Sequence, residues 1–258
     1  MGKAWERFGK VLMNQIVYFK LYKSFLRILD WIFPPRCPVC DCILDSGELI
    51  HEKCRRKLFF AKEPCCVRCG RPVDSDRKEY CFDCSKQGLR SFSQGKSLFV
   101  YKGAIKGTMY RFKYSNKREY GNFFAEEAVK NYSKWLRQKE IQAIVPVPMY
   151  RKKKRIRGYN QAEVFAKALS AQTGIPVETN IVMRVRDTKP LKLLNPEERK
   201  NNLKNAFQGI NNIVKYDHIL LVDDIYTTGS TAEAVSRELL KMGAKEVCLL
   251  CICIGEGT

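Results

Sequence analysis

The spacing of hydrophobic residues along the chain predicts a sheet of parallel strands with helices between them. Short apolar runs near residues 97–101, 143–147, 181–185, 218–223 and 246–253 predict strands. Apolar residues at helical spacing near residues 104–114, 121–137, 159–173 and 231–242 predict helices. Strands that alternate with helices are typical of a parallel sheet covered on both faces. We therefore expect an α/β fold over residues 91–258.

The N-terminal segment, residues 1–36, carries a purely helical pattern. Apolar residues recur among lysines and arginines, and Pro34 and Pro35 end the pattern. We expect one or two amphipathic helices with a basic polar face. Such a helix packs on its own protein or on a partner, or lies on an anionic membrane surface, and the sequence leaves these interpretations open. We expect no signal peptide and no membrane span, because no run approaches ~18 consecutive apolar residues.

The net charge of the chain indicates which class of partner it binds. Lysine and arginine outnumber aspartate and glutamate by 47 to 27, which gives the 258 residues a net charge of +20. An excess of this size predicts a polyanionic partner, which is nucleic acid, a phosphorylated small molecule or an acidic membrane surface. Hydrophobic residues make up 45% of the chain, so the charge belongs to a globular protein and not to a disordered tail.

Cysteine pairs between the two regions predict metal sites. Nine of the twelve cysteines lie within residues 37–90, mostly as Cys-x-x-Cys. Without a signal peptide, such pairs indicate metal ligands in a reducing, cytoplasmic compartment and not disulfides. Each pair forms a tight turn that aims two side chains at one ion, and two turns complete a tetrahedron. We predict a double zinc ribbon over residues 37–90, between the helical segment 1–36 and the α/β domain 91–258. The predicted Zn²⁺ ligands are Cys37, Cys40, His51 and Cys54 in one site and Cys66, Cys69, Cys81 and Cys84 in the other.

The remaining cysteines bear on this assignment. Cys42 and Cys65 lie next to predicted ligands, and either could replace its neighbour. Four protein ligands leave no open coordination position, so both zinc ions should be structural. Cys248, Cys251 and Cys253 fall in the last predicted strand, where we expect buried small hydrophobic residues.

Two adjacent aspartates follow an apolar strand in the stretch ILLVDDIYTTGST, residues 219–231. They stand at the carboxyl end of a buried strand, where open α/β sheets bind their ligands. The turn that follows offers backbone amides, hydroxyl groups and a helix N-terminus to an anion, and its glycine allows close approach. The pattern predicts a sugar-phosphate site. Its residues are Asp223, Asp224, Thr227, Thr228, Gly229, Ser230 and Thr231.

This stretch resembles the phosphoribosyl pyrophosphate (PRPP) motif of type I phosphoribosyltransferases. The resemblance implies that the aspartates hold the ribose hydroxyls, that residues 227–231 bind the 5′-phosphate, and that Mg²⁺ accompanies PRPP. Upstream, Pro146, Val147 and Pro148 end a strand in a proline-fixed loop that takes the pyrophosphate in such folds. A Walker B strand is disfavoured because the only Gly-Lys-Ser, residues 95–97, lacks the first glycine of a P-loop. A receiver domain would carry its acid pair near its start.

An ordered set of motifs is similar to that of the ComF family of bacterial competence proteins. The set comprises the double zinc ribbon, VPVP (145–148), RGYNQAE (157–163), RDTKP (186–190), RKNN (199–202) and LLVDDIYTTGST (220–231). The resemblance covers residues 33–258 and implies a type I phosphoribosyltransferase fold. Two positions depart from the family pattern, because His51 replaces a cysteine and Leu191 replaces a glutamine. Membership implies a cytoplasmic role in natural transformation, handling single-stranded DNA beside the DNA-translocation ATPase. Contact with the inner membrane face through the N-terminal helix is a further option.

Basic residues interleaved with aromatics agree in part with a role on DNA. Residues 110–120 and the basic run 151–157 would suit a groove in which bases stack on rings and phosphates meet cations. The same residues also fit a helix with its aromatics in the core, and the basic run also fits pyrophosphate or solvent. The candidate nucleic-acid contacts are Arg151, Lys152, Lys153, Lys154, Arg155, Arg157, Lys113, Lys117 and Arg118.

Three functions follow from these patterns. The first is a PRPP-binding competence protein that handles single-stranded DNA during DNA uptake. The second is an active phosphoribosyltransferase in which a nitrogen nucleophile displaces pyrophosphate from C1 of PRPP. The third is a PRPP sensor without catalysis. Glutamine-dependent amidotransfer is disfavoured because the first cysteine, Cys37, lies in a metal pair and not at the N-terminus.

Overall fold

The computed structural model describes residues 34–86, 88, 90–186, 206–210 and 215–257. The chain divides into two compact units, Met1–His51 and Glu52–Thr258. Amphipathic helices are expected over residues 1–36, and residues 1–33 of that segment lie outside the described residues. Most of the RDTKP motif also lies outside the described residues, as do Leu191 and the RKNN motif.

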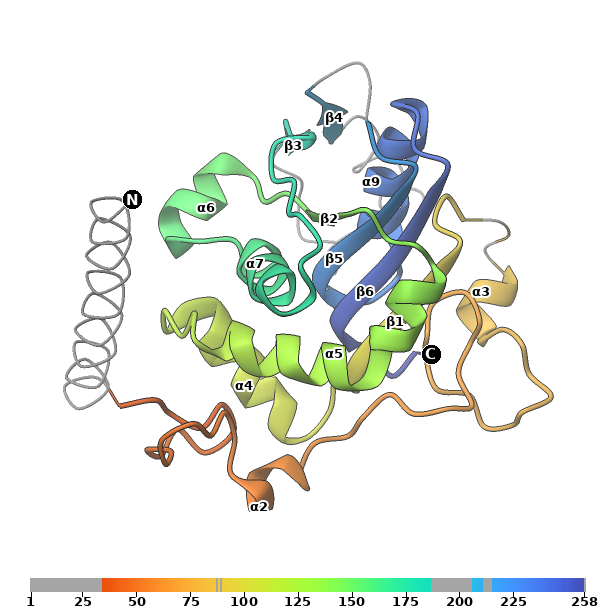
Figure 1. Ribbon diagram of the computed structural model, residues 1–258. Coiled ribbons are helices and arrows are strands. Elements are labelled where there is room, and N and C mark those ends of the chain that lie inside the picture. The colour runs from red at the N-terminus through yellow and green to blue at the C-terminus, as the bar shows by residue number, and fades with distance from the viewer. Residues whose placement is uncertain (1–33, 87, 89, 187–205, 211–214, 258) are drawn as a thin grey trace, which may run out of the picture. The chain divides into compact units, whose positions relative to one another are not determined.

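The larger unit is built on a parallel sheet of four strands (Figure 1). In spatial order the strands are β1 (Gln94–Val100), β6 (Glu246–Ile254), β5 (His218–Tyr226) and β2 (Ala143–Pro146). Every neighbouring pair is parallel, and the register sets Asp223 of β5 opposite Cys251 of β6. The central strands are buried on both faces, as their continuous apolar runs predict. The three cysteines of β6 are buried there, as expected.

Helices cover both faces of this sheet (Figure 1). One face carries α5 (Tyr120–Gln138) and α7 (Gln161–Thr173), and the other carries α9 (Ser230–Lys241). A further helix, α4 (Ala104–Tyr114), packs on α5, with the ring of Phe112 5.3 Å from that of Phe124. Each helix buries the apolar positions that predicted it. The predicted α/β fold class is therefore confirmed.

Two elements differ from the sequence expectation. The predicted strand near 181–185 exists as β3 (Val182–Arg184), but it pairs antiparallel with β4 (Phe207–Gly209), away from the parallel sheet. The basic run, which lies in none of the predicted helices or strands, forms helix α6 (Arg151–Arg157). Lysine and arginine are good helix formers, and Gly158 ends the helix with a left-handed φ of 84°.

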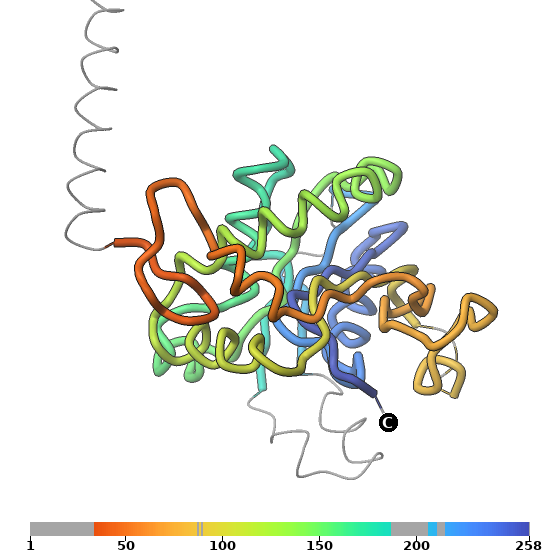
Figure 2. The backbone as a smooth tube through the Cα atoms, turned by 90° about the horizontal axis from the view of Figure 1, so that it is seen from below, coloured from red at the N-terminus to blue at the C-terminus, as the bar shows by residue number. Residues whose placement is uncertain are grey.

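The second ribbon, residues 65–84, belongs to the core of the larger unit. Its four predicted ligands are buried in one cluster with apolar residues of β5, β6 and α9. A Cβ atom added to Gly70 would lie 2.7 Å from the carbonyl oxygen of Gly95 in β1, so the ribbon touches the sheet directly. Short helices, α2 (Glu52–Arg55) and α3 (Phe82–Lys86), carry ligand cysteines. The C-terminal residues also lie beside this ribbon (Figure 2), with Gly257 next to Arg71.

Candidate functional site

The first predicted metal cluster brings its four ligands together. The ligand atoms of Cys37, Cys40, His51 and Cys54 lie within 4.8 Å of one another. His51 Nε2 donates a hydrogen bond to the carbonyl oxygen of Ile43 at 3.1 Å, which leaves the Nδ1 lone pair toward Cys40 Sγ at 3.3 Å. A hydrogen bond of this kind fixes the tautomer of a zinc-bound histidine. The donor set therefore fits Zn²⁺ with three thiolates and one imidazole.

The second cluster is closed and buried. Cys66, Cys69, Cys81 and Cys84 bring four sulfur atoms within 4.8 Å. The sulfur atoms of Cys69 and Cys81 are 3.7 Å apart, close to the roughly 3.8 Å edge of a tetrahedron with Zn–S bonds of ~2.3 Å. The neighbours left open by the sequence lie outside both clusters, because the thiols of Cys42 and Cys65 approach backbone carbonyl groups instead. Both clusters thus suit structural zinc.

The acid pair lies at the carboxyl end of β5. Asp223 Oδ1 accepts a hydrogen bond from the Asp224 amide at 2.8 Å, and Asp224 Oδ1 accepts one from the Ile225 amide at 2.6 Å. Lys113 of α4 forms an ion pair with Asp224 Oδ2 at 2.8 Å. Burial and the neighbouring carboxylate raise the pKa of Asp223 from 3.8 to about 8. Burial opposes the charge of Lys113, but the aspartates outweigh it and raise the pKa of this ammonium group.

The turn after the acid pair is shaped around Gly229. This residue has a φ of 76°, and a side chain there would collide with the hydroxyl of Tyr226. Thr228 Oγ1 and Ser230 Oγ are hydrogen-bonded at 2.8 Å on the same turn. Within the described part of the chain, the amides of Thr227, Thr228 and Gly229 donate to no protein acceptor. The turn, which we call the phosphate loop (Thr227–Thr231), therefore presents open amides beside the N-terminus of α9.

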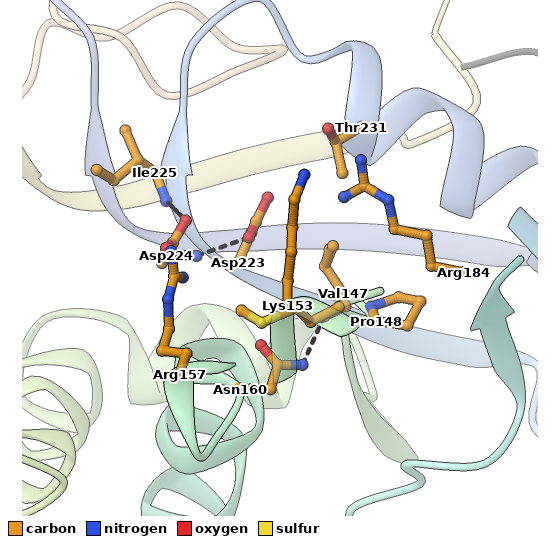
Figure 3. A pocket seen from close by; sticks show the side chains of 11 residues that line it. Val147, Pro148, Lys153, Arg157, Asn160, Arg184, Asp223, Asp224, Ile225 and Thr231 are labelled. Carbon is orange, nitrogen blue, oxygen red and sulfur yellow. Dashed lines mark hydrogen bonds between the residues drawn. The ribbon is translucent and has the colours of Figure 1, made fainter. Parts of the chain in front are cut away.

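One pocket joins these parts (Figure 3). The predicted residues Val147, Pro148, Asp223, Asp224 and Thr231 line it, together with Met149, Lys153, Arg157, Asn160, Arg184 and Ile225. Pro146 ends β2, and residues 227–230 form the loop between β5 and α9. Lys153 and Arg157 lie one helical turn apart on α6, so a single face of that helix lines the pocket. The pocket therefore sets two acids against three cations, Lys153 and Arg157 from α6 and Arg184 from β3.

Sequence reasoning did not assign Asn160 or Arg184 to this pocket. Asn160 caps α7 and donates from Nδ2 to the carbonyl oxygen of Val147 at 2.9 Å, which fixes the proline loop. An asparagine before a helical pattern is a capping signal that could have found it. Arg184 reaches the pocket from β3. The sequence groups Lys113 with the nucleic-acid contacts, and the structure sets it on Asp224.

A basic and aromatic surface adjoins the pocket. Tyr110 and Tyr114, one turn apart on α4, are 63% and 62% exposed, with ring centroids 5.1 Å apart. Arg157 lies over the ring of Tyr114 at 5.0 Å and also lines the pocket. The intervening Phe112 is buried in the core, so the aromatic stretch is divided between core and surface. Of the other predicted cations, Lys154 pairs with Glu163 at 2.7 Å.

The remaining cations of the predicted nucleic-acid set lie on α6 and in the connection between α4 and α5. Arg151, Lys152 and Arg155 are on the exposed side of α6. Arg118 lies over the ring of Tyr159 at 4.9 Å, and Lys117 pairs with Glu119 at 3.7 Å. Their role in binding nucleic acid stays a prediction.

Comparison with known proteins places the chain in a family. It is 32% identical over 213 residues to competence protein F of Haemophilus influenzae, an alignment that covers 75% of this chain and 92% of that protein. The chain belongs to the ComF family of competence proteins. Competence protein ComFC of Bacillus subtilis is 29% identical over 206 residues, which cover 78% of this chain and 82% of that protein. DNA utilization protein YhgH of Escherichia coli is 36% identical over 110 residues, covering 43% of this chain and 48% of that relative.

Two further comparisons concern parts of this ComF-family chain. Residues 28–85 match the double zinc ribbon domain family. Among solved structures, a purine phosphoribosyltransferase from Pyrococcus horikoshii is 21% identical, with a TM-score of 0.32 over 51% of this chain and 73% of the other. Within the described residues, none of the helices is both long and apolar enough to cross a bilayer.

Proposed function

We propose that this ComF-family protein binds PRPP in the pocket at the carboxyl end of β5. The proposal rests on one observation, which is that three kinds of protein group surround a single pocket. An acid pair, Thr231 of the phosphate loop and two cations of α6 border the same pocket, and the open amides belong to residues 227–229 of that loop. A ribose that carries a phosphate at one end and a pyrophosphate at the other has matching groups for all three.

Each part has a separate task in this proposal. Asp223 and Asp224 accept hydrogen bonds from the ribose hydroxyls, and the phosphate loop donates amides to the 5′-phosphate. Lys153 and Arg157 neutralise the pyrophosphate. The carboxylates also suit Mg²⁺, which binds through one or two carboxylates together with substrate phosphates. When bound, Mg²⁺ would supply positive charge to the pyrophosphate, while the protein's own residues hold and orient the sugar.

Calorimetric titration of the zinc-loaded chain with PRPP and MgCl₂ tests this site. Replacing both acids, Asp223→Asn with Asp224→Asn, should weaken PRPP binding by at least about a hundredfold, because the variant loses two hydrogen bonds to the sugar together with the Mg²⁺ ligands. The variant should keep its zinc content and its circular dichroism spectrum, since neither residue touches a ribbon. An affinity equal to that of the wild type would refute the site.

We further propose that the protein handles single-stranded DNA during DNA uptake in the cytoplasm. The names of its relatives, two competence proteins and a DNA utilization protein, support the biological role. Physically, the exposed pair Tyr110 and Tyr114 offers rings on which bases stack, at ~1–3 kcal/mol per base. The exposed cations of α6 suit the phosphates, and Arg157 of the same helix lies over the ring of Tyr114. The Cys-x-x-Cys pairs, as metal ligands, support a reducing compartment.

The DNA proposal is tested by the salt dependence of oligothymidylate binding, measured by fluorescence anisotropy. Lys152→Gln with Arg155→Gln should lower the slope of log K against log salt by roughly 0.7 for each phosphate group that the variant no longer neutralises. Tyr110→Ala with Tyr114→Ala should weaken binding at every salt concentration and leave the slope unchanged. Lys241→Gln, which removes an exposed cation from α9, is the matched control. If all variants bind DNA like this control, the proposal that this surface contacts DNA is refuted.

A further inference from the structure

The second zinc ribbon holds the back of the phosphate loop through two arginines. Arg71, which is only 6% exposed, pairs through Nη1 with Asp83, a residue inside the Cys81–Cys84 turn. Its Nη2 donates to the carbonyl oxygen of Thr227 at 3.1 Å. Arg90, in the segment that leaves the ribbon, donates from Nη2 to the carbonyl oxygen of Thr228 at 2.8 Å. Successive carbonyl groups of the loop are thus bound from the ribbon side.

These two contacts also orient the amides of the loop. In a trans peptide the carbonyl group and the following N–H point in opposite directions. Since the carbonyls of Thr227 and Thr228 face the arginines, the amides of Thr228 and Gly229 face the opposite side. Neither of these amides has a protein acceptor among the described residues. The arginines therefore aim both donors outward and place positive charge behind an anion site.

Two further contacts connect the ribbon and the segment that leaves it to α9 and β1. Glu233, in the first turn of α9, accepts hydrogen bonds from the amide and hydroxyl of Ser91 at 2.8 and 2.7 Å. The Gly95 amide donates to the carbonyl oxygen of Arg68 at 2.6 Å, which seats the ribbon on β1. The ribbon cannot shift without pulling on the start of α9 and on the loop. Four zinc ligands in turn fix the two ligand turns of the ribbon relative to each other, because both turns would bind one ion.

We propose that Arg71 and Arg90 are positioning residues that transmit the order of the second zinc site to the phosphate loop. Affinity for a sugar 5′-phosphate then depends on the second zinc ion, although that ion does not touch the ligand. This inference rests on the proposed PRPP site. It assigns the arginines to one end of the ligand only, because the pyrophosphate end is served by α6.

Two probe ligands separate this role from a general effect on the fold. Ribose 5-phosphate tests the phosphate loop, and inorganic pyrophosphate tests Lys153 and Arg157. Both are titrated by calorimetry into the zinc-loaded full chain, the wild type and the variants Arg71→Lys and Arg90→Lys. Lysine keeps the charge but lacks the forked guanidinium that reaches Asp83 and Thr227 together. Arg77→Lys, at an exposed position of the same ribbon, is the matched control.

Each arginine variant should bind ribose 5-phosphate about tenfold more weakly, the equivalent of one hydrogen bond to a charged group. Pyrophosphate affinity and zinc content by elemental analysis should match those of the wild type and of Arg77→Lys. Unchanged affinity for ribose 5-phosphate, or an equal loss for both ligands, would overturn the positioning role. A wild type that binds neither ligand would instead refute the proposed PRPP site, and this inference with it.

Linkage supplies a second measurement that needs no variant. If zinc occupancy strengthens 5′-phosphate binding, saturating ribose 5-phosphate must strengthen zinc binding by the same factor. Competition with a chromogenic chelator should therefore show tighter retention of one zinc ion per chain, while ribose, which lacks the phosphate, leaves zinc retention unchanged. Equal retention with and without ribose 5-phosphate would contradict the coupling.

Discussion

Replacing Asp223 by asparagine should stabilise the protein by an amount that grows as the pH rises. The folded state raises the pKa of this carboxyl from 3.8 to about 8, through burial first and the charge of Asp224 second. Between these values the folded chain keeps a proton that the unfolded chain releases. Stability therefore falls as pH rises through this window. Asparagine has nearly the same shape and does not titrate, so the variant escapes this loss.

The size of the effect follows from the pKa shift. Each pH unit inside the window removes at most about 1.4 kcal/mol of unfolding free energy. Between about pH 5 and about pH 7 the variant should gain up to ~2.7 kcal/mol relative to the wild type. Asp223 lies on a pocket wall and not in the deep core, so a gain on the order of 1 kcal/mol is the minimum we expect.

Urea unfolding at the two pH values, with zinc held constant, measures this gain. The zinc ligands titrate alike in both proteins, so their contribution cancels in the difference between variant and wild type. Asp217→Asn, just before the opposite end of β5, removes a carboxylate that is 47% exposed and should shift stability by less than about 0.5 kcal/mol at either pH. A difference for Asp223→Asn that is the same at both pH values would show that the buried-acid reasoning is wrong.

Three further predictions concern other parts of the chain. Elemental analysis should find two zinc ions per chain, with one lost in His51→Ala and both kept in His51→Cys; a full complement in His51→Ala would remove His51 from the ligand set. Gly229→Ala should lower PRPP affinity at least about tenfold, because the left-handed φ and the Tyr226 hydroxyl oppose a side chain; calorimetry showing wild-type affinity would contradict the loop geometry. Glu127→Gln should destabilise the protein by about 2 kcal/mol, since this carboxylate is 2% exposed and accepts two hydrogen bonds from Arg55. Arg55→Met with Glu127→Leu should recover most of that loss in urea unfolding, and no recovery would mean that packing, not the charge pair, dominates.

The sequence predicted those strands and turns whose structure is determined by a few neighbouring residues. Strands β5 and β6 are continuous apolar runs, and their burial on both faces leaves little choice of structure. The Cys-x-x-Cys turns and the motif around Asp223 encode their geometry within a few residues. Family resemblance added the assignment to the ComF family, which the match to competence protein F confirms.

The parts that could not be predicted depend on contacts between distant segments. Helix α6 has no buried residue, so its sequence has no apolar stripe from which a helix could be predicted. Lys113 meets Asp224 only after α4 packs beside the sheet. Arg71 and Arg90 reach the phosphate loop across 156 and 138 residues of sequence, and nothing near either arginine indicates that contact.

The buried side chain of Asn160 illustrates how such long-range demands restrict one position. Its oxygen accepts from the Ala162 amide at 3.2 Å to begin α7, while its nitrogen holds the Val147 carbonyl at 2.9 Å. Aspartate would keep the helix start but turn a second oxygen toward that carbonyl, and serine would be too short to span both. In a library randomised at position 160, selection for thermal stability and selection for ligand binding should therefore both enrich asparagine.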